Sequence, residues 1–179
     1  MTKQTFVLER LVTPTGPMLL VIDDEQRLRA VDWQDHEARM RRMLQRHGGG
    51  EAVQLRETAN SSTARRSLEA YFAGDIDAIT GAVTATNGTV FQRNVWNALR
   101  EIPAGRPISY SALAARIGKP KAVRAVGLAN GANPIAIFVP CHRVIGADNS
   151  LTGYGGGLDR KRWLLQHESA GEIYSQLRF

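Results

Sequence analysis

The sequence predicts an α+β protein with a small sheet-and-helix part in its first half and a mostly helical part in its second half. Two observations carry this prediction. Three short apolar segments typical of β-strands occur before residue 34, whereas apolar residues recur at helical spacing in most of the chain beyond it. Residues 75–88 are rich in Gly, Thr, Ala and Asn and show neither pattern. We therefore expect a supporting domain at 1–86 and a second domain at 87–179.

Three strands and then two helices are expected in the first half. The strands are residues 6–12, 18–22 and 28–33, and polar or proline-containing turns separate them. The helices cover residues 35–47 and 62–73, and glycine follows each of them, which favours a helix C-terminus. This order predicts a small sheet packed against helices.

Helix-capping signals organise the second half. Thr89 and Gln92 have the spacing of a capping box, and the helix that they begin is expected to end at Pro103. Ser109 is expected to cap a short helix that closes at Gly118. Pro120 then opens a helix over residues 121–130. Two short helices joined by a tight turn are typical of a helix-turn-helix unit.

The second helix of this unit has an unusual composition. After Lys121 its only charged residue is Arg124, and its other side chains are mostly small. A helix that reads the major groove needs several long polar side chains. Small residues instead permit close approach of the backbone to a narrow groove. The alternative is a buried, alanine-rich packing helix.

Composition and charge exclude several classes of protein. The 179 residues are 43% hydrophobic and 22% charged, as in a globular protein. Apolar runs such as residues 135–139 are far too short to cross a bilayer, and the first residues lack the apolar core of a signal peptide. One cysteine excludes an intrachain disulfide and a zinc site of several thiolates. An unpaired thiol favours a reducing compartment, so we expect a cytoplasmic protein.

The positive charge is concentrated in one half of the chain. The net charge is +6, and residues 1–89 carry 11 basic and 12 acidic side chains, whereas residues 90–179 carry 12 and 5. A basic half indicates a polyanionic partner, most often nucleic acid. The alternative is that the charge serves solubility alone.

The single thiol has candidate partners for nucleophilic chemistry. Cys141 follows an expected buried strand at residues 135–139, His142 is adjacent, and Glu168 lies on the last expected helix. Cysteine, histidine and a carboxylate are the groups of an activated nucleophile. Neighbouring side chains on an extended strand point to opposite faces, so contact between thiol and imidazole would need a turn or a bridging water. The alternative is an inert cysteine in the core.

Six ordered segments together carry a family resemblance. The segment Pro140-Cys141-His142-Arg143-Val144 resembles the active-site signature of the O6-alkylguanine-DNA alkyltransferases, the methylated-DNA–protein-cysteine methyltransferases. The others follow the family's order and spacing across most of residues 89–168: Ile108-Ser109-Tyr110, Arg124-Ala125-Val126-Gly127, Asn130-Gly131-Ala132-Asn133-Pro134, Gly153-Tyr154-Gly155-Gly156-Gly157, and Trp163-Leu164-Leu165 with His167-Glu168. The first third, with Thr13-Pro14-Thr15-Gly16-Pro17 and Tyr71-Phe72-Ala73-Gly74, is similar to the bacterial constitutive type.

The resemblance implies a fold and a reaction. It implies an RNase H-like first domain and a second domain with a winged-helix-type DNA-binding unit. The implied activity is direct reversal of O6-alkylguanine, and of O4-alkylthymine, in duplex DNA. In the family the reactive cysteine takes the alkyl group by in-line displacement at carbon. Because the product is a thioether without a good leaving group, one alkyl group per molecule is expected.

The resemblance also assigns catalytic roles by position. Cys141 would be the acceptor, His142 the general base acting through a water, and Glu168 the group that orients the imidazole. Asn133 would hold the turn that carries the cysteine, and Tyr110 would donate a hydrogen bond to the guanine ring as negative charge develops on it. Without the resemblance, Tyr110 could equally be a core residue over the helix start.

A second set of residues would bind the DNA. The resemblance implies that the helix carrying Arg124 enters the minor groove and that Arg124 fills the space of a flipped-out nucleotide. The implied DNA contacts are Arg124, Ala125, Ala129, Gly131, Tyr110 and Ser111. The implied alkyl pocket is lined by Tyr154, Gly155, Gly156 and Val144.

The resemblance implies no cofactor and a protein that is monomeric in solution, while clustering on DNA stays open. Relatives that bind zinc use cysteine and histidine in the first domain, but this half has His36 and His47 without a cysteine, so no metal is expected. Gly155 stands where some relatives carry serine, which leaves the preferred alkyl size open. No P-loop lysine follows the glycine-rich segment, so a nucleotide site is not expected.

Three other functions are weighed against this one. A lesion-binding protein without transfer activity would lack the reactive cysteine. A cysteine hydrolase built on Cys141, His142 and Glu168 would need an oxyanion hole and would leave the DNA-helix features unexplained. A transcriptional regulator would need long base-reading side chains that the second helix lacks.

Overall fold

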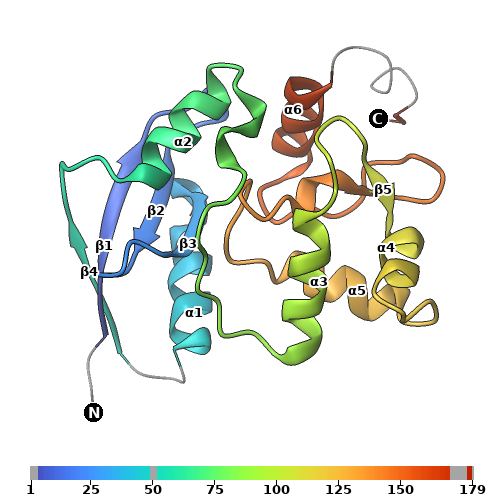
Figure 1. Ribbon diagram of the computed structural model, residues 1–179, viewed down its shortest axis with the longest axis horizontal. Helices are drawn as coiled ribbons and strands as arrows, with labels where there is room; N and C mark the ends of the chain where they lie inside the picture. The colour runs from blue at the N-terminus through green and yellow to red at the C-terminus, as the bar shows by residue number, and fades with distance from the viewer. Residues whose placement is uncertain (1–3, 49–51, 170–176, 179) are drawn as a thin grey trace. The chain divides into compact units, whose positions relative to one another are not determined.

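The computed structural model describes residues 4–48, 52–169 and 177–178, and the chain divides into two compact units. The first unit consists of Met1–Asn87 together with Pro134–Phe138. The second unit consists of Gly88–Asn133 and Val139–Phe179. A sheet with helices in the first unit and a mainly helical second unit confirm the predicted α+β class (Figure 1).

The first unit contains a four-stranded sheet with the strand order β3-β2-β1-β4. Its strands are β1 (Gln4–Leu11), β2 (Met18–Ile22), β3 (Leu28–Trp33) and β4 (Val53–Glu57). The pairs β1–β2 and β2–β3 are antiparallel, and β4 runs parallel to β1. The first three strands confirm the prediction. Strand β4 was not predicted, because it is a short edge strand whose side chains are half-buried or exposed and give little apolar signal.

Helix α1 (Glu37–His47) covers one face of this sheet after a short 3₁₀ turn, η1 (Gln34–His36). Met40 and Leu44 recur at helical spacing and pack with alternate strand residues such as Phe6, Leu8 and Leu19. The alternating apolar residues of the strands and the helically spaced apolar residues of α1 therefore form one apolar cluster. The helix predicted over residues 35–47 is confirmed.

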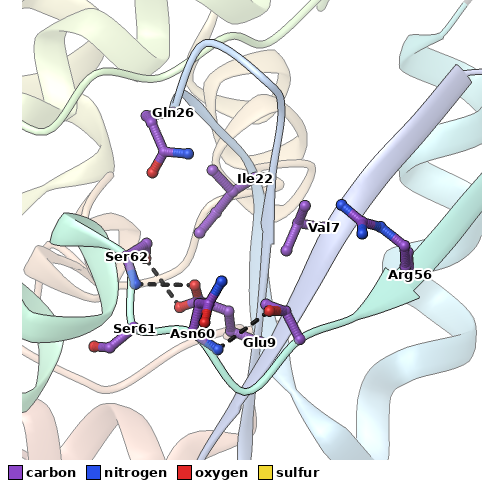
Figure 2. A pocket seen from close by; sticks show the side chains of 9 residues that line it. Val7, Glu9, Ile22, Gln26, Arg56, Asn60, Ser61 and Ser62 are labelled. Carbon is purple, nitrogen blue, oxygen red and sulfur yellow. Dashed lines mark hydrogen bonds between the residues drawn. The ribbon is translucent and has the colours of Figure 1, made fainter.

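Helix α2 (Thr63–Phe72) begins beside a polar pocket of the first unit. Ser62 caps the helix by accepting a hydrogen bond from the backbone N–H of Arg65 (3.0 Å). The backbone N–H and the hydroxyl of Ser62 both donate to the buried Glu9 carboxylate at 2.9 Å (Figure 2). The pocket has a volume of about 300 Å³, and none of the predicted site residues lines it. A 3₁₀ turn, η2 (Ile76–Ile79), follows the helix.

Residues 134–138 are buried but do not form the strand that the sequence predicts. Ile135 makes a single bridge with Val31, through hydrogen bonds from Val31 N–H to the Pro134 carbonyl (3.0 Å) and from Ala136 N–H to the Val31 carbonyl (2.9 Å). The backbone of Ile137 then has φ 70°, in the left-handed region that β-branched residues rarely adopt. This residue breaks the extended conformation, so the prediction was right about burial and wrong about the strand.

The described residues of the second unit form mainly four α-helices. They are α3 (Val90–Arg100), α4 (Tyr110–Arg116), α5 (Val123–Gly131) and α6 (Leu158–Glu168). A 3₁₀ turn, η3 (Cys141–Arg143), and a parallel pair of two-residue strands, β5 (Ile108–Ser109) and β6 (Val144–Ile145), complete it. Helices α4 and α5 pack against each other, as expected for a helix-turn-helix unit (Figure 1).

The predicted caps of α3 and α4 are confirmed. Thr89 and Gln92 form both hydrogen bonds of a capping box at the start of α3. Ser109 accepts from the backbone N–H of Ala112 (3.1 Å) at the start of α4. Helix α5 begins at Val123, two residues later than predicted. No helix among the described residues is long and apolar enough to cross a membrane.

Candidate active site

The thiol of Cys141 lies in the second unit at the first residue of η3, with 7% of the residue exposed. The side-chain amide of Asn133 donates to the Val139 carbonyl (2.7 Å) and contacts Cys141 Sγ (3.1 Å). Asn130 Nδ2 lies 3.4 Å from the Cys141 carbonyl oxygen. Two asparagines therefore hold the turn that carries the sulfur. Only Asn133 was singled out from the sequence, because nothing in the local pattern marks Asn130 as a second anchor.

His142, Arg143 and Glu168 form a buried charged cluster next to this turn. His142 Nε2 lies 2.8 Å from Glu168 Oε1. Arg143 donates to both carboxylate oxygens at 2.9 Å and also to the carbonyl of Ile102 (2.6 Å). A 3₁₀ turn has about three residues per turn, so the side chains of Cys141 and His142 leave the backbone in different directions. Arg143 was not among the residues with a predicted role.

The carboxylate of Glu168 stays ionised in this cluster. Burial by itself raises the pKa of Glu168, but its interactions with His142 and Arg143 outweigh burial and lower it well below its usual range. An ionised carboxylate only accepts hydrogen bonds, so Nε2 of His142 is the nitrogen that donates to it. His142 Nδ1 is buried and has no hydrogen-bond partner among the described residues.

Helix α6 also carries a buried lysine, Lys161, that was not among the predicted site residues. Lys161 has no exposed surface, and its Nζ donates to the Thr152 carbonyl (2.8 Å) and lies 5.8 Å from the ring centre of Tyr110. Burial lowers the pKa of Lys161 to about 8, and a charge on Cys141 acts in the opposite direction. A signal was present in the sequence of α6, because Lys161 lies three and four residues before Leu164 and Leu165, the spacing of one helical stripe. The structure buries all three of these residues and Glu168.

Tyr110 begins α4 and lies against the loop that precedes α6. Its hydroxyl is 3.3 Å from the Thr152 carbonyl oxygen and 3.4 Å from that of Gly153. Burial raises the pKa of Tyr110, so the phenol is a protonated hydrogen-bond donor at neutral pH. Ser111, the next residue, is exposed, and its hydroxyl lies 2.8 Å from that of Ser109.

The residues predicted to line an alkyl pocket occupy two segments of the second unit. The ring of Tyr154 meets that of His142 edge to face, with 6.5 Å between the ring centres. Val144 in β6 and Gly156 in the loop are buried, whereas Gly155 is half-buried. The structure thus brings Tyr154 to the imidazole, and Val144 directly follows the turn that holds the thiol.

The predicted DNA contacts on α5 separate into exposed and buried residues. Arg124, Ala125 and Gly131 are exposed. Ala129 is buried, and its carbonyl accepts a hydrogen bond from Trp96 Nε1 (2.9 Å). The side chain of Ala129 therefore packs inside the unit, unlike those of Arg124 and Ala125.

Comparisons with known proteins agree in one family. Residues 90–170 match the family described as 6-O-methylguanine DNA methyltransferase, DNA binding domain, and residues 10–81 match its ribonuclease-like domain. The methylated-DNA–protein-cysteine methyltransferase of Salmonella typhimurium is 50% identical over 160 residues, which cover 89% of this chain and 94% of that protein. The corresponding protein of Shigella flexneri is 48% identical over the same shares.

Solved structures give the same result. The crystal structure of Mycobacterium tuberculosis OGT in complex with DNA aligns with a TM-score of 0.72 and 39% identity, over 97% of this chain and 94% of that one. The crystal structure of the Mycobacterium tuberculosis O6-methylguanine methyltransferase aligns with a TM-score of 0.70 and 38% identity over the same shares. The agreement of both domains, the curated relatives and the fold shows that this chain belongs to the 6-O-methylguanine DNA methyltransferase family, the methylated-DNA–protein-cysteine methyltransferases.

Proposed function

We propose that this chain repairs O6-alkylguanine in duplex DNA, and O4-alkylthymine as well, by moving the alkyl group onto Cys141 Sγ. The observation that carries the proposal is the placement of the chain's single thiol. It contacts Asn133 at 3.1 Å and shares its turn with His142, which is paired with the buried Glu168 of α6. The sulfur is thus held in one position beside a base oriented by a carboxylate, as an activated nucleophile requires. Membership of the family supports alkyl transfer to cysteine as the reaction.

The imidazole of His142 is the base in this proposal. Glu168 occupies Nε2 as a hydrogen-bond acceptor, so Nδ1 carries the lone pair that can receive a proton. A water between Nδ1 and the thiol would carry the proton from Cys141. Buried Lys161 adds a positive charge that stabilises the thiolate, because its pKa of about 8 leaves it largely protonated at neutral pH.

The transfer exchanges one bond for another. Cys141 Sγ forms a bond to the alkyl carbon while the bond from that carbon to guanine O6 breaks. The electron pair of the broken bond stays on the base, which gains a proton in place of the alkyl group. Tyr110 would turn its hydroxyl from the loop carbonyls, at 3.3 and 3.4 Å, toward the guanine ring and stabilise the developing negative charge. The product is a thioether, so each chain reacts once.

The DNA is expected to bind along α5. Arg124 and Ala125 are exposed on this helix, which carries no acidic side chain. The thiol of the buried Cys141 cannot reach a base inside a duplex, so the damaged nucleotide must leave the stack, and Arg124 would fill its place. Binding should depend weakly on sequence and strongly on salt. The protein would act as a monomer in the cytoplasm, where the thiol stays reduced.

Intact-mass measurement tests the proposal. The protein is incubated with excess duplex that contains one O6-methylguanine, and the expected product is a single added methyl group, mapped to Cys141 and limited to one per chain. Repeated turnover would instead indicate a cysteine hydrolase, and an unmodified protein would indicate a lesion-binding role. Either result contradicts the proposal.

Arg124→Ala tests the route to the base. The variant is expected to react with the duplex more slowly by a factor of about 100, since the flipped state loses the group that fills the stack. Its reaction with free O6-benzylguanine should stay close to that of the unmodified protein. Equal losses on both substrates would contradict a role in nucleotide flipping.

A further inference from the structure

Leu128 is a large apolar side chain that α5 leaves in solvent. It is 72% exposed, compared with 44% for Leu158 at the start of α6 and 67% for Val90 at the start of α3. Single exposed leucines are common on protein surfaces and need no explanation by themselves. Leu128 differs from these other residues in its position on α5.

Leu128 shares a helix face with the arginine proposed to enter the DNA. Residues three or four apart on a helix lie on the same side, so Arg124, Leu128 and Gly131 form one exposed stripe. Val126 and Ala129, on the other side, are buried in the unit. At 1.5 Å of rise per residue, Leu128 lies about 6 Å from Arg124 along the helix axis. None of the residues that the structure describes would contact a methyl group at Gly131, so the end of the stripe is open.

The charges around this stripe favour a polyanion over another protein surface. Helix α5 contains no acidic residue, and Lys119 and Lys121 are exposed just before it. The other exposed residues of the helix, Ala125 and Gly131, are small and give no broad apolar patch of the kind that protein partners cover. A DNA minor groove offers a matching surface, because its walls are formed by the apolar edges of deoxyribose between two rows of phosphates.

We propose that Leu128 is a second minor-groove contact, which packs against the deoxyribose edges beside the position where Arg124 enters the stack. This inference rests on the proposed function of α5, and it adds Leu128 to the DNA contacts that were expected from the sequence. The leucine loses its solvent exposure only when DNA is bound, so its burial strengthens binding of any duplex. It takes no part in the chemistry at Cys141.

Leu128→Ala tests the contact, with Val90→Ala as the matched control on a different helix. Binding to an undamaged duplex of fixed length is measured by fluorescence anisotropy across a range of salt concentrations. Leu128→Ala is expected to raise Kd by about five- to ten-fold, as expected from the apolar surface lost, without changing the slope of log Kd against log salt. The rate of alkyl transfer from subsaturating duplex should fall by the same factor, and the rate with free O6-benzylguanine should not change.

Other outcomes have defined meanings. If Leu128→Ala binds the duplex as well as Val90→Ala and the unmodified protein, the contact does not exist. If its melting temperature falls, or its reaction with the free base slows, Leu128 acts through the fold and the proposal is wrong. If a loss appears only on long duplexes that hold several copies, the leucine contacts a second copy of this chain instead of DNA.

A failure of the underlying function is distinguishable. Arg124→Ala and Lys121→Ala are measured in the same assay, and normal binding by both would show that α5 does not face DNA. Weakened binding by these variants together with normal binding by Leu128→Ala would leave the function intact and overturn only the role of Leu128.

Discussion

The Glu168 carboxylate receives hydrogen bonds from His142 and from two nitrogens of Arg143, Nε and Nη2. All three residues are buried, so the carboxylate is the group that makes a buried arginine tolerable. The same carboxylate fixes which imidazole nitrogen can act as a base. Structure and chemistry therefore depend on one residue at the last position of α6.

Glu168→Gln removes this charge while it preserves the shape of the side chain. Arg143 then lacks a counter-charge, and breaking a buried ion pair typically costs about 3–5 kcal/mol of unfolding free energy. Denaturant unfolding should show a loss of this order, and single-turnover alkyl transfer should slow because the imidazole loses its orienting acceptor. The control is Glu57→Gln, which breaks the exposed ion pair with Arg10 and should leave both measurements unchanged. Equal losses in the two variants would contradict the argument.

Lys161→Met should slow the reaction and stabilise the fold at neutral pH. Burial lowers the pKa of Lys161 to about 8, so its ammonium group supports a thiolate at pH 7 and loses its charge as the pH rises through 8. Alkyl-transfer rates from pH 6 to 9 should therefore show a deficit in the variant on the order of ten-fold below pH 8 that narrows above it. A deficit that does not change with pH would mean that Lys161 acts only by packing.

The difference in unfolding free energy between the unmodified protein and Lys161→Met should also depend on pH. The folded pKa of Lys161 lies below the ordinary value of 10.5, so the unfolded chain binds more protons between pH 8 and 10.5. The contribution of this group to stability therefore rises with pH over that window. Unfolding at pH 7 and pH 10 should show that Lys161→Met is the more stable protein at pH 7 and that its advantage shrinks at pH 10.

At the residue scale, the sequence could predict groups that carry a motif but not all of their partners. Cys141, His142 and Glu168 are found by their chemistry and by resemblance. Lys161 could have been found from the spacing of buried residues in α6, whereas its contact with the Thr152 carbonyl depends on how a loop folds back. The partners of Arg143 likewise come from α6 and from Ile102, far along the chain.

At the scale of single elements, the start of α2 joins a cap to a buried carboxylate. Ser62 accepts from Arg65 N–H and donates its hydroxyl to Glu9, which is 2% exposed. Ser62→Ala should therefore cost about 2 kcal/mol of unfolding free energy, from loss of the cap and of one partner of a buried acid. Ser109→Ala removes a cap on α4 that has no buried acid beside it, and about 1 kcal/mol is expected there. Thermal or denaturant unfolding of both variants compares the two losses, and a larger loss at Ser109 would refute the explanation.

Elements with strong local signals could be predicted, and elements defined by long-range pairing could not. The capping box of α3 and the serine cap of α4 lie within four residues of the helix starts, and both are confirmed. Strand β4 owes its conformation to pairing with β1 at the edge of the sheet, which its polar sequence does not reveal. Residues 135–139 read as a strand because they are apolar, but the left-handed Ile137 prevents one. Burial and strand formation are separate properties, and the apolar run indicated only the first.

At the scale of the whole molecule, the first unit includes a segment from the second half of the chain. Pro134–Phe138 belongs to the unit formed by Met1–Asn87. The domain division between residues 86 and 87, which stays a prediction, assigns this segment to the second domain instead. Val31 makes two backbone hydrogen bonds to the segment, with the carbonyl of Pro134 and the N–H of Ala136. Cys141 follows the segment after only two residues.

A fragment of residues 88–179 should therefore be impaired although it contains every predicted site residue. Its residues 134–138 would lack Val31 and the rest of the first unit, so buried residues such as Ile135 would become exposed. The fragment is expected to melt at a lower temperature than the full chain and to transfer methyl groups more slowly, as measured by calorimetry and by intact mass. A fragment with the stability and rate of the full chain would show that the first unit is dispensable.

Because residues 134–138 belong to the first unit, they also determine when that unit can finish folding during translation. The bridge between Val31 and Ile135 closes a loop of about 100 residues, a long-range contact that is slow to form. A ribosome releases the chain from its N-terminus, so the sheet strands emerge long before the segment that completes their unit. The first unit cannot be finished until the chain has been made almost to Cys141. A newly made molecule therefore completes its first unit and gains its reactive sulfur within the same few residues of translation.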